Sequence, residues 1–83
     1  MIHQMFSIQD TKAQTFNPPF FQKNHQEAIR TFSKICNDST SMLNQYPEDF
    51  ILLHVGAFCD ETGEIIPSTL SNIGTASQYI KNS

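Results

Sequence analysis

The alternation of apolar and polar positions is clearest in two stretches of the chain, and both predict β-strands. Between residues 50 and 59, apolar side chains occupy both sides of an extended chain, which is typical of a central strand covered on both faces. Between residues 2 and 10, Ile2, Phe6 and Ile8 fall on one side, and polar side chains dominate the other. We therefore expect a sheet built around one strongly apolar strand.

The segment after the central strand predicts a hairpin and then a weak helix. Residues 60–63, Asp-Glu-Thr-Gly, have the composition of a tight turn. A short strand over 64–66 is expected to return from this turn and to end at Pro67. The apolar residues that follow have a loose helical spacing, although Gly74 disfavours a helix interior. We expect a weak C-terminal helix and a frayed tail over about 71–83.

One amphipathic helix is predicted near the middle of the chain. Asn24 is a good N-cap, and Glu27 follows three residues later, as in a capping box. Arg30 and Lys34 lie four residues apart and share a polar face. The opposite face is an apolar stripe made of Ala28, Ile29, Phe32, Ile35 and Cys36.

Residues 11–23 are interpreted as a long loop. Pro18 and Pro19 remove two backbone donors, and they push Asn17 toward an extended conformation. Loops of this length in compact domains are often functional or disordered. The three phenylalanines within the segment argue against disorder, so the loop is expected to pack on a core or to present its rings to a partner.

Together these elements predict one α+β domain over residues 1–83. The expected architecture is a three-stranded, mainly antiparallel sheet with one main amphipathic helix on one face and a weak C-terminal helix. The other face of the sheet would be apolar and open. Because a chain of 83 residues has a marginal core of its own, a second copy of the chain is the natural cover, and we expect a homo-oligomer.

The charge balance narrows the range of partners. The net charge is −3, which by itself disfavours non-specific binding to nucleic acid. The first 36 residues, however, carry four cations and two anions, whereas the remainder carries one cation and six anions. A basic face is therefore possible in the first half alone. No signal peptide and no apolar run of membrane-spanning length are recognised, so we expect neither membrane insertion nor secretion.

Catalytic and metal-binding patterns are not found in the sequence. The histidines and cysteines are scattered, without the closely spaced pairs of a zinc site, so no metal and no cofactor are expected. Cys59 precedes two acidic residues, which are expected to raise its thiol pKa and to disfavour a reactive thiolate. Neither a nucleophile motif nor a phosphate-binding glycine loop occurs. We therefore do not expect an enzyme and assign no catalytic residues.

One set of residues has the chemistry of a single-stranded nucleic-acid site, in which cations contact phosphates and aromatic rings stack on bases. The competing interpretation is that the rings plug the sheet and that the cations are merely solvated, and the residues alone favour it. The candidate binding residues are Lys12, Phe16, Phe20, Phe21, Lys23, Arg30 and Lys34.

Several motifs in this order resemble a known viral family. They are D-x-K at residues 10–12, F-N-P-P-F at 16–20, A-I-R-x-F at 28–32, P-E-D-F at 47–50, G-x-F-x-D-E-T-G at 56–63 and I-P at 66–67. This set resembles the small non-structural protein of gokushovirus-type microviruses, which are phages with a single-stranded DNA genome. The resemblance covers residues 5 to 70 or so, and the tail after Leu70 matches poorly.

The resemblance implies a protein that acts in viral DNA synthesis or packaging in the cytoplasm of a bacterial host. It makes single-stranded DNA a natural ligand for the candidate residues, bound by an oligomer. The alternative is a protein-interaction factor that binds a viral replication or capsid-assembly protein without contacting DNA. The resemblance carries over no catalytic residues.

Overall fold

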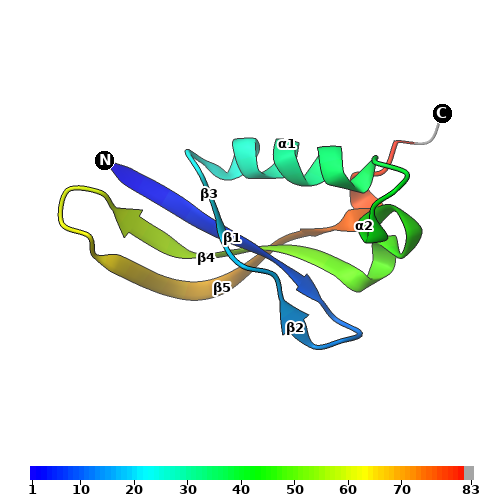
Figure 1. Cartoon of the computed structure of the whole chain (residues 1–83), viewed down its shortest axis with the longest axis horizontal. Coiled ribbons are helices and arrows are strands. Elements are labelled where there is room, and N and C mark those ends of the chain that lie inside the picture. Colours follow the sequence, from blue (N-terminus) through cyan, green and yellow to red (C-terminus); the bar gives the residue numbers. More distant parts are fainter. Residues whose placement is uncertain (82–83) are drawn as a thin grey trace.

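The computed structural model describes residues 1–81 and shows one antiparallel sheet with a helix along one of its faces (Figure 1). The neighbouring strands run in the order β2-β1-β4-β5, and β3 also pairs with β1. The elements are β1 (Ile2–Asp10), β2 (Thr15–Phe16), β3 (Phe20–Gln22), α1 (His25–Cys36), α2 (Met42–Gln45), a 3-10 turn η1 (Pro47–Asp49), β4 (Phe50–Cys59), β5 (Ile65–Thr75) and a second 3-10 turn η2 (Ala76–Gln78).

The expected three-stranded sheet is wrong, because the sheet has five strands. The two strands that were not expected lie in the segment interpreted as a loop over 11–23. β2 and β3 both pair with β1 and form one edge of the sheet, interrupted at Asn17–Pro19. Proline cannot donate to a strand ladder, but an edge strand tolerates such an interruption. What remains of the expected loop is the turn over 11–14 and the short connections on either side of β3.

The expected C-terminal helix and the expected end of the third strand are also wrong. β5 continues through Pro67 and ends at Thr75, and up to residue 81 only the short turn η2 follows it. The amide of Cys59 donates to the carbonyl of Glu64, so the alternation of an antiparallel ladder turns the backbone of Ile65 and Pro67 toward the free edge. Proline lacks a backbone N–H, but at residue 67 that group would point away from β4. Pro67 therefore costs the ladder no hydrogen bond, which is why it does not end the strand.

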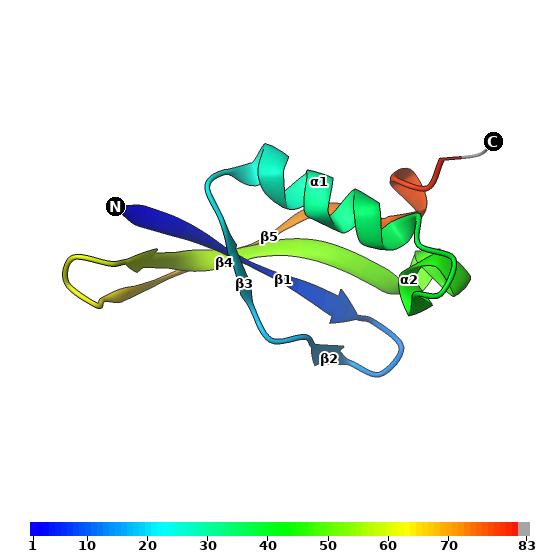
Figure 2. The ribbon, with the colours of Figure 1, turned by 45° about the horizontal axis from the view of Figure 1, so that its top comes forward.

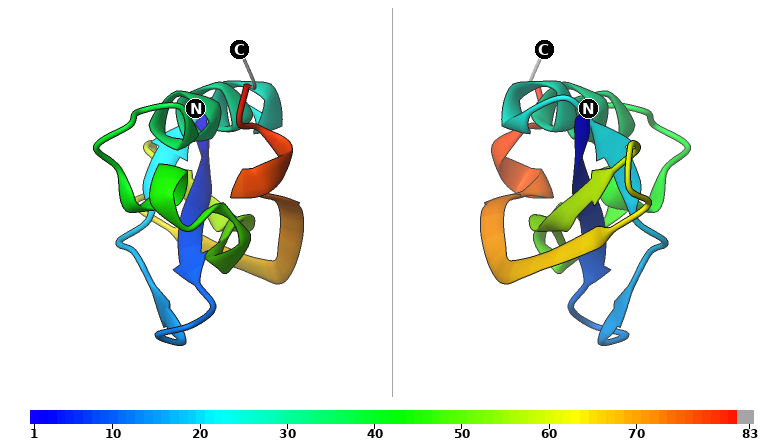
Figure 3. Two further views of the ribbon diagram at one scale, coloured as in Figure 1. Left: turned by 90° about the vertical axis from the view of Figure 1, so that its right-hand side faces the viewer. Right: turned by 90° about the vertical axis from the view of Figure 1, so that its left-hand side faces the viewer.

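The central strand is β4, as its apolar pattern predicts. It pairs with β1 on one side and with β5 on the other. Phe50 and Leu52 are buried on the side of the sheet that α1 covers, and Leu53 is buried on the opposite side. The end views place β5 at one edge of the sheet and β2 at the other (Figure 3).

α1 begins and ends where its capping residues predict. The Asn24 side chain accepts a hydrogen bond from the amide of Glu27 at 2.9 Å, and Asn37 caps the last turn. The apolar stripe of α1 packs on the sheet through the fully buried Ala28, Phe32 and Cys36. Phe6, Ile8 and Leu52 meet this stripe from the strands, which places the core between α1 and the sheet.

The described part of the tail is tied to the end of α1. The Tyr79 ring lies edge-on to Phe32, with ring centroids 5.7 Å apart. The Asn37 side chain donates to the Tyr79 carbonyl at 2.9 Å and accepts from the Lys81 amide at 2.7 Å. The expectation of a frayed tail over 71–83 is therefore wrong up to residue 81, and residues 82–83 lie outside the described part.

α1 covers one half of the sheet lengthwise. Figures 1 and 2 show β1, β4 and β5 extending past the N-terminal end of α1 as an arm, with the hairpin turn Asp60–Gly63 at its tip. The molecule is accordingly elongated, with principal extents of 44 × 26 × 19 Å. Ile65 and Ile66 on this arm are 64% and 42% exposed.

Candidate nucleic-acid interface

Two of the predicted aromatic residues lie on the side of the sheet that points away from α1, which we call the open face. Phe21 pairs with Met5 and Phe16 pairs with Gln9, and each ring is 48% exposed. Directly paired residues of antiparallel strands project from the same side, and consecutive residues of one strand project from opposite sides. Phe6 faces α1, so Met5, Gln9 and their partners face away from it.

The proline segment holds these two rings apart along the edge of the sheet. The Asn17 amide donates to the Ile8 carbonyl at 2.8 Å, and the Ser7 hydroxyl donates to the Asn17 carbonyl at 2.8 Å. These two hydrogen bonds fix Asn17 to β1, and we call this contact the Asn17 bridge. Phe16 precedes it in the chain, and Phe21 follows it. The Phe21 ring also lies 6.1 Å from that of Phe58 on the same face, so it has a defined neighbour.

Two of the predicted cations flank the open face at opposite ends of the β2–β3 edge. Lys12 is exposed in the turn between β1 and β2, where the Asp10 carboxylate accepts from the amides of Lys12 and Ala13 at 3.0 and 3.1 Å. Lys23 is exposed directly after β3 and lines a small hollow of about 220 Å³ together with His3 and Phe21. The arrangement offers two half-exposed rings between two cations.

Phe20 is not part of this surface. It pairs with Phe6 on the side of the sheet that α1 covers, and the two ring centroids lie 6.0 Å apart. It packs against the buried core, so its ring is not available to a base. The alternation of β3 explains the result, because consecutive residues of a strand must face opposite sides.

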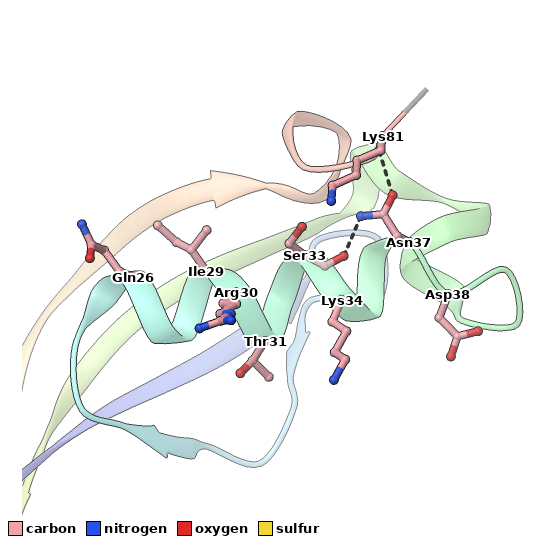
Figure 4. Close-up of a pocket in the computed structure, with 9 residues that line it drawn as sticks. All are labelled: Gln26, Ile29, Arg30, Thr31, Ser33, Lys34, Asn37, Asp38 and Lys81. Carbon is pink, nitrogen blue, oxygen red and sulfur yellow. Dashed lines mark hydrogen bonds between the residues drawn. The ribbon is translucent and has the colours of Figure 1, made fainter. Parts of the chain in front are cut away.

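Arg30 and Lys34 lie on the outer side of α1, across the molecule from the open face (Figure 4). They line a shallow hollow of about 920 Å³ together with Ile29, Asn37 and Lys81. Arg30 is 82% exposed, and its guanidinium lies 3.8 Å from the Glu27 carboxylate. The predicted set is therefore divided between two surfaces.

Two residues were missed by the sequence analysis. Phe58 supports Phe21 on the open face. Simple alternation along the central strand puts Phe58 on the side of Phe50 and Leu52, which α1 covers, but the register shift between β1 and β4 beside His54 reverses the side of the residues that follow. Lys81 joins Arg30 and Lys34 because Asn37 holds the tail against α1. No local pattern around Lys81 indicated that contact.

The pKa of the Cys59 thiol shifts in the direction opposite to the one expected. The hydrogen bond from the Thr62 side chain, followed by the backbone amides of Thr62 and Glu61, holds the pKa of Cys59 below its usual value. These donors outweigh the neighbouring carboxylates, so the expected upward shift is wrong. Burial raises the pKa of Cys36 to about 11.

Within residues 1–81, no three side chains of the His, Cys, Asp or Glu type are grouped so as to hold a metal ion. None of the helices in this part of the chain has the length and apolar character needed to span a membrane.

Comparison with known proteins confirms the viral resemblance. Residues 3–79 match the family model described as Phage ORF5 protein. A curated relative, Protein ORF5 of the gokushovirus-type Chlamydia phage 1, is 35% identical over 66 residues, which cover 75% of this chain and 69% of the relative. No solved structure matches the chain. The chain is therefore a phage protein and belongs to the Phage ORF5 protein family.

Proposed function

We propose that this protein binds single-stranded DNA on the open face of its sheet, in support of viral DNA synthesis or packaging. The observation that carries the proposal is the position of Phe16 and Phe21, two half-exposed rings on a sheet surface with Lys12 and Lys23 at its two ends. Sequence-tolerant binding of single strands needs rings for stacking and cations for phosphates.

The proposed path of the DNA follows the β2–β3 edge. The Asn17 bridge separates the two rings, so we expect Phe16 and Phe21 to stack on bases that are not adjacent. Lys12 and Lys23 would then contact phosphates beyond the two stacked bases. Arg30 and Lys34 belong to the other surface and have no part in this path.

The charge distribution supports this orientation. The acidic residues of the hairpin tip, Asp60, Glu61 and Glu64, are exposed at the end of the arm and repel a phosphate backbone. The edge that carries β2 and β3 holds both lysines. The DNA is therefore expected to run along this edge and away from the tip.

The test is a titration of a fluorescently labelled single-stranded oligonucleotide, followed by anisotropy at low and moderate salt. Micromolar or tighter binding that weakens with added salt supports the proposal, since cations release condensed counterions from the strand. A duplex of the same length is the matched control and should bind more weakly, because its bases are already stacked. Absence of binding at low salt would contradict the proposal and favour a protein partner.

A further inference from the structure

The arm of the sheet is uncovered on the side that carries α1. α1 begins at His25, whose ring lies 5.0 Å from that of His54 and 5.4 Å from that of Phe6. Beyond this level β1 and β4 continue through the pairs Gln4–Ala57 and Ile2–Cys59. Among residues 1–81 no helix lies over these pairs.

The uncovered half of this side is apolar at its exposed positions. Ile2 faces the same side as Gln4 and Phe6, since alternate residues of a strand share a side and the Gln4 side chain meets His54 at 2.8 Å. Ile66 pairs with Ala57 and faces this side as well. Ile2 and Ile66 are 47% and 42% exposed, so this half of the sheet has the character of a docking surface.

The same chain carries a surface of complementary charge. In Figure 1 α1 lies above one half of the sheet, and β4 and β5 of the arm lie below the level of the helix, whereas the N-terminal end of β1 rises to that level. Its outer side presents the cations Arg30, Lys34 and Lys81 around the hollow of about 920 Å³. The arm ends in the exposed carboxylates of Asp60, Glu61 and Glu64.

We propose that two copies of this chain interlock about a two-fold axis, each placing its α1 over the arm of the other. In this arrangement the outer side of α1 faces Ile2 and Ile66 of the partner copy, and its cations approach the partner's acidic tip. A two-fold contact of this kind is self-complementary and forms every interaction twice. The occupant is a second copy because one chain supplies both an exposed cationic surface on α1 and an exposed acidic tip on the arm.

The open face stays free in this dimer. Phe16 and Phe21 project from the other side of the sheet, so the proposed DNA surface of each copy remains exposed. The two surfaces meet only at the small hollow that Ile2 and Lys23 both line, so dimerisation and DNA binding are tested by separate measurements and each proposal can fail without the other. DNA is a poor occupant of the arm itself, because the carboxylates of the tip repel phosphate.

The experiment is sedimentation velocity on the full chain over a concentration series, with two charge-reversal variants. Arg30→Glu/Lys34→Glu reverses α1, and Glu61→Lys/Glu64→Lys reverses the tip. Arg30 and Glu61 are 82% and 81% exposed, so the folds should be retained, which far-UV circular dichroism checks. The wild type is expected to sediment as a dimer of the 9.4 kDa chain.

Each variant alone is expected to dimerise at least tenfold more weakly than the wild type, and an equimolar mixture of the two should recover the dimer. Lys12→Glu/Glu48→Lys is the matched control, because it reverses two exposed charges away from both surfaces and should leave the dimer intact. Ile66→Glu should also weaken the dimer. A wild type that stays monomeric throughout, or charge-reversed variants whose mixture does not recover the dimer, would overturn the proposal.

Discussion

The backbone of Gly56 passes so close to Ile66 that a Cβ atom at residue 56 would lie 2.6 Å from the Ile66 carbonyl oxygen. Gly56 pairs with Pro67 beside a register shift between β4 and β5. Because the obstacle is backbone, Gly56→Ala must separate the two strands. We expect a loss of about 1–3 kcal/mol in the free energy of unfolding, measured by urea titration.

Gly63 provides the matched control for this substitution. It has a φ of 75°, and nothing lies within 4 Å of the position of its Cβ. Gly63→Ala should therefore cost about 1–2 kcal/mol through backbone conformation alone, and Gly63→Asn should cost less, because Asn tolerates left-handed backbone. If Gly56→Ala is as stable as the wild type, the close approach of the two strands is not retained in solution.

Asn37 joins the end of α1 to the tail, and its removal should detach the tail. The Asn37 side chain donates to the carbonyls of Ser33 and Tyr79 at 2.7 and 2.9 Å and accepts from the Lys81 amide at 2.7 Å. At about 0.5–1.5 kcal/mol per net hydrogen bond, loss of the two bonds to the tail in Asn37→Ala should lower the free energy of unfolding by about 1–3 kcal/mol. Hydrogen exchange should accelerate at the Lys81 amide in this variant and stay unchanged in the arm.

The two thiols should react in a fixed order with iodoacetamide near neutral pH. Hydrogen bonds from Thr62 lower the pKa of Cys59, whereas burial raises the pKa of Cys36 to about 11. The thiolate is the reactive form, so mass spectrometry should show Cys59 modified first and Cys36 modified only upon unfolding. Thr62→Val should slow the reaction at Cys59. Equal rates for both thiols in the native protein would contradict the burial of Cys36.

Stability should fall in mild acid because of His54. Burial is the main cause that lowers the pKa of His54, and the neighbouring His25 adds to it. The unfolded chain, with a histidine pKa of about 6.5, therefore binds a proton before the folded one does as the pH falls. The free energy of unfolding should decrease from about pH 6.5 downward and level off below the lowered pKa of His54. In His54→Gln this part of the dependence should disappear from urea titrations.

The strands and helix with strong periodicity could be predicted from the sequence. β1, β4 and α1 have the expected bounds because apolar residues fix which side of each element is buried. β2 and β3 were not predicted, and β5 was expected only as a short strand over 64–66, because the prolines in both segments were interpreted as ends of extended pairing. Pro18, Pro19 and Pro67 indicated chain breaks, and an edge of a sheet accommodates each of them.

The candidate site was predictable in composition and not in arrangement. Phe20 and Phe21 have the same local signal, and the alternation of a strand that was itself not predicted decides which ring is exposed. Arg30 and Lys34 were correctly placed on the polar side of the helix. The side of the sheet on which α1 would pack could not be read from the helix itself, so their separation from Phe16 required the tertiary structure.

Removing the rings of the open face should weaken binding of single-stranded DNA more than removing the cations of α1. Stacking on one base contributes about 1–3 kcal/mol, so Phe16→Ala and Phe21→Ala should each weaken affinity about fivefold or more in anisotropy titrations.

Lys12→Ala and Lys23→Ala should each reduce the slope of log affinity against log salt by about 0.7. Arg30→Ala/Lys34→Ala is the control and should leave this slope unchanged, since both residues lie across the molecule. Phe21→Leu keeps an apolar contact with Phe58 and removes the aromatic surface, so it should resemble Phe21→Ala in binding and the wild type in stability. Loss of binding in the α1 variant alone would place the DNA on the helix and contradict the role of the open face.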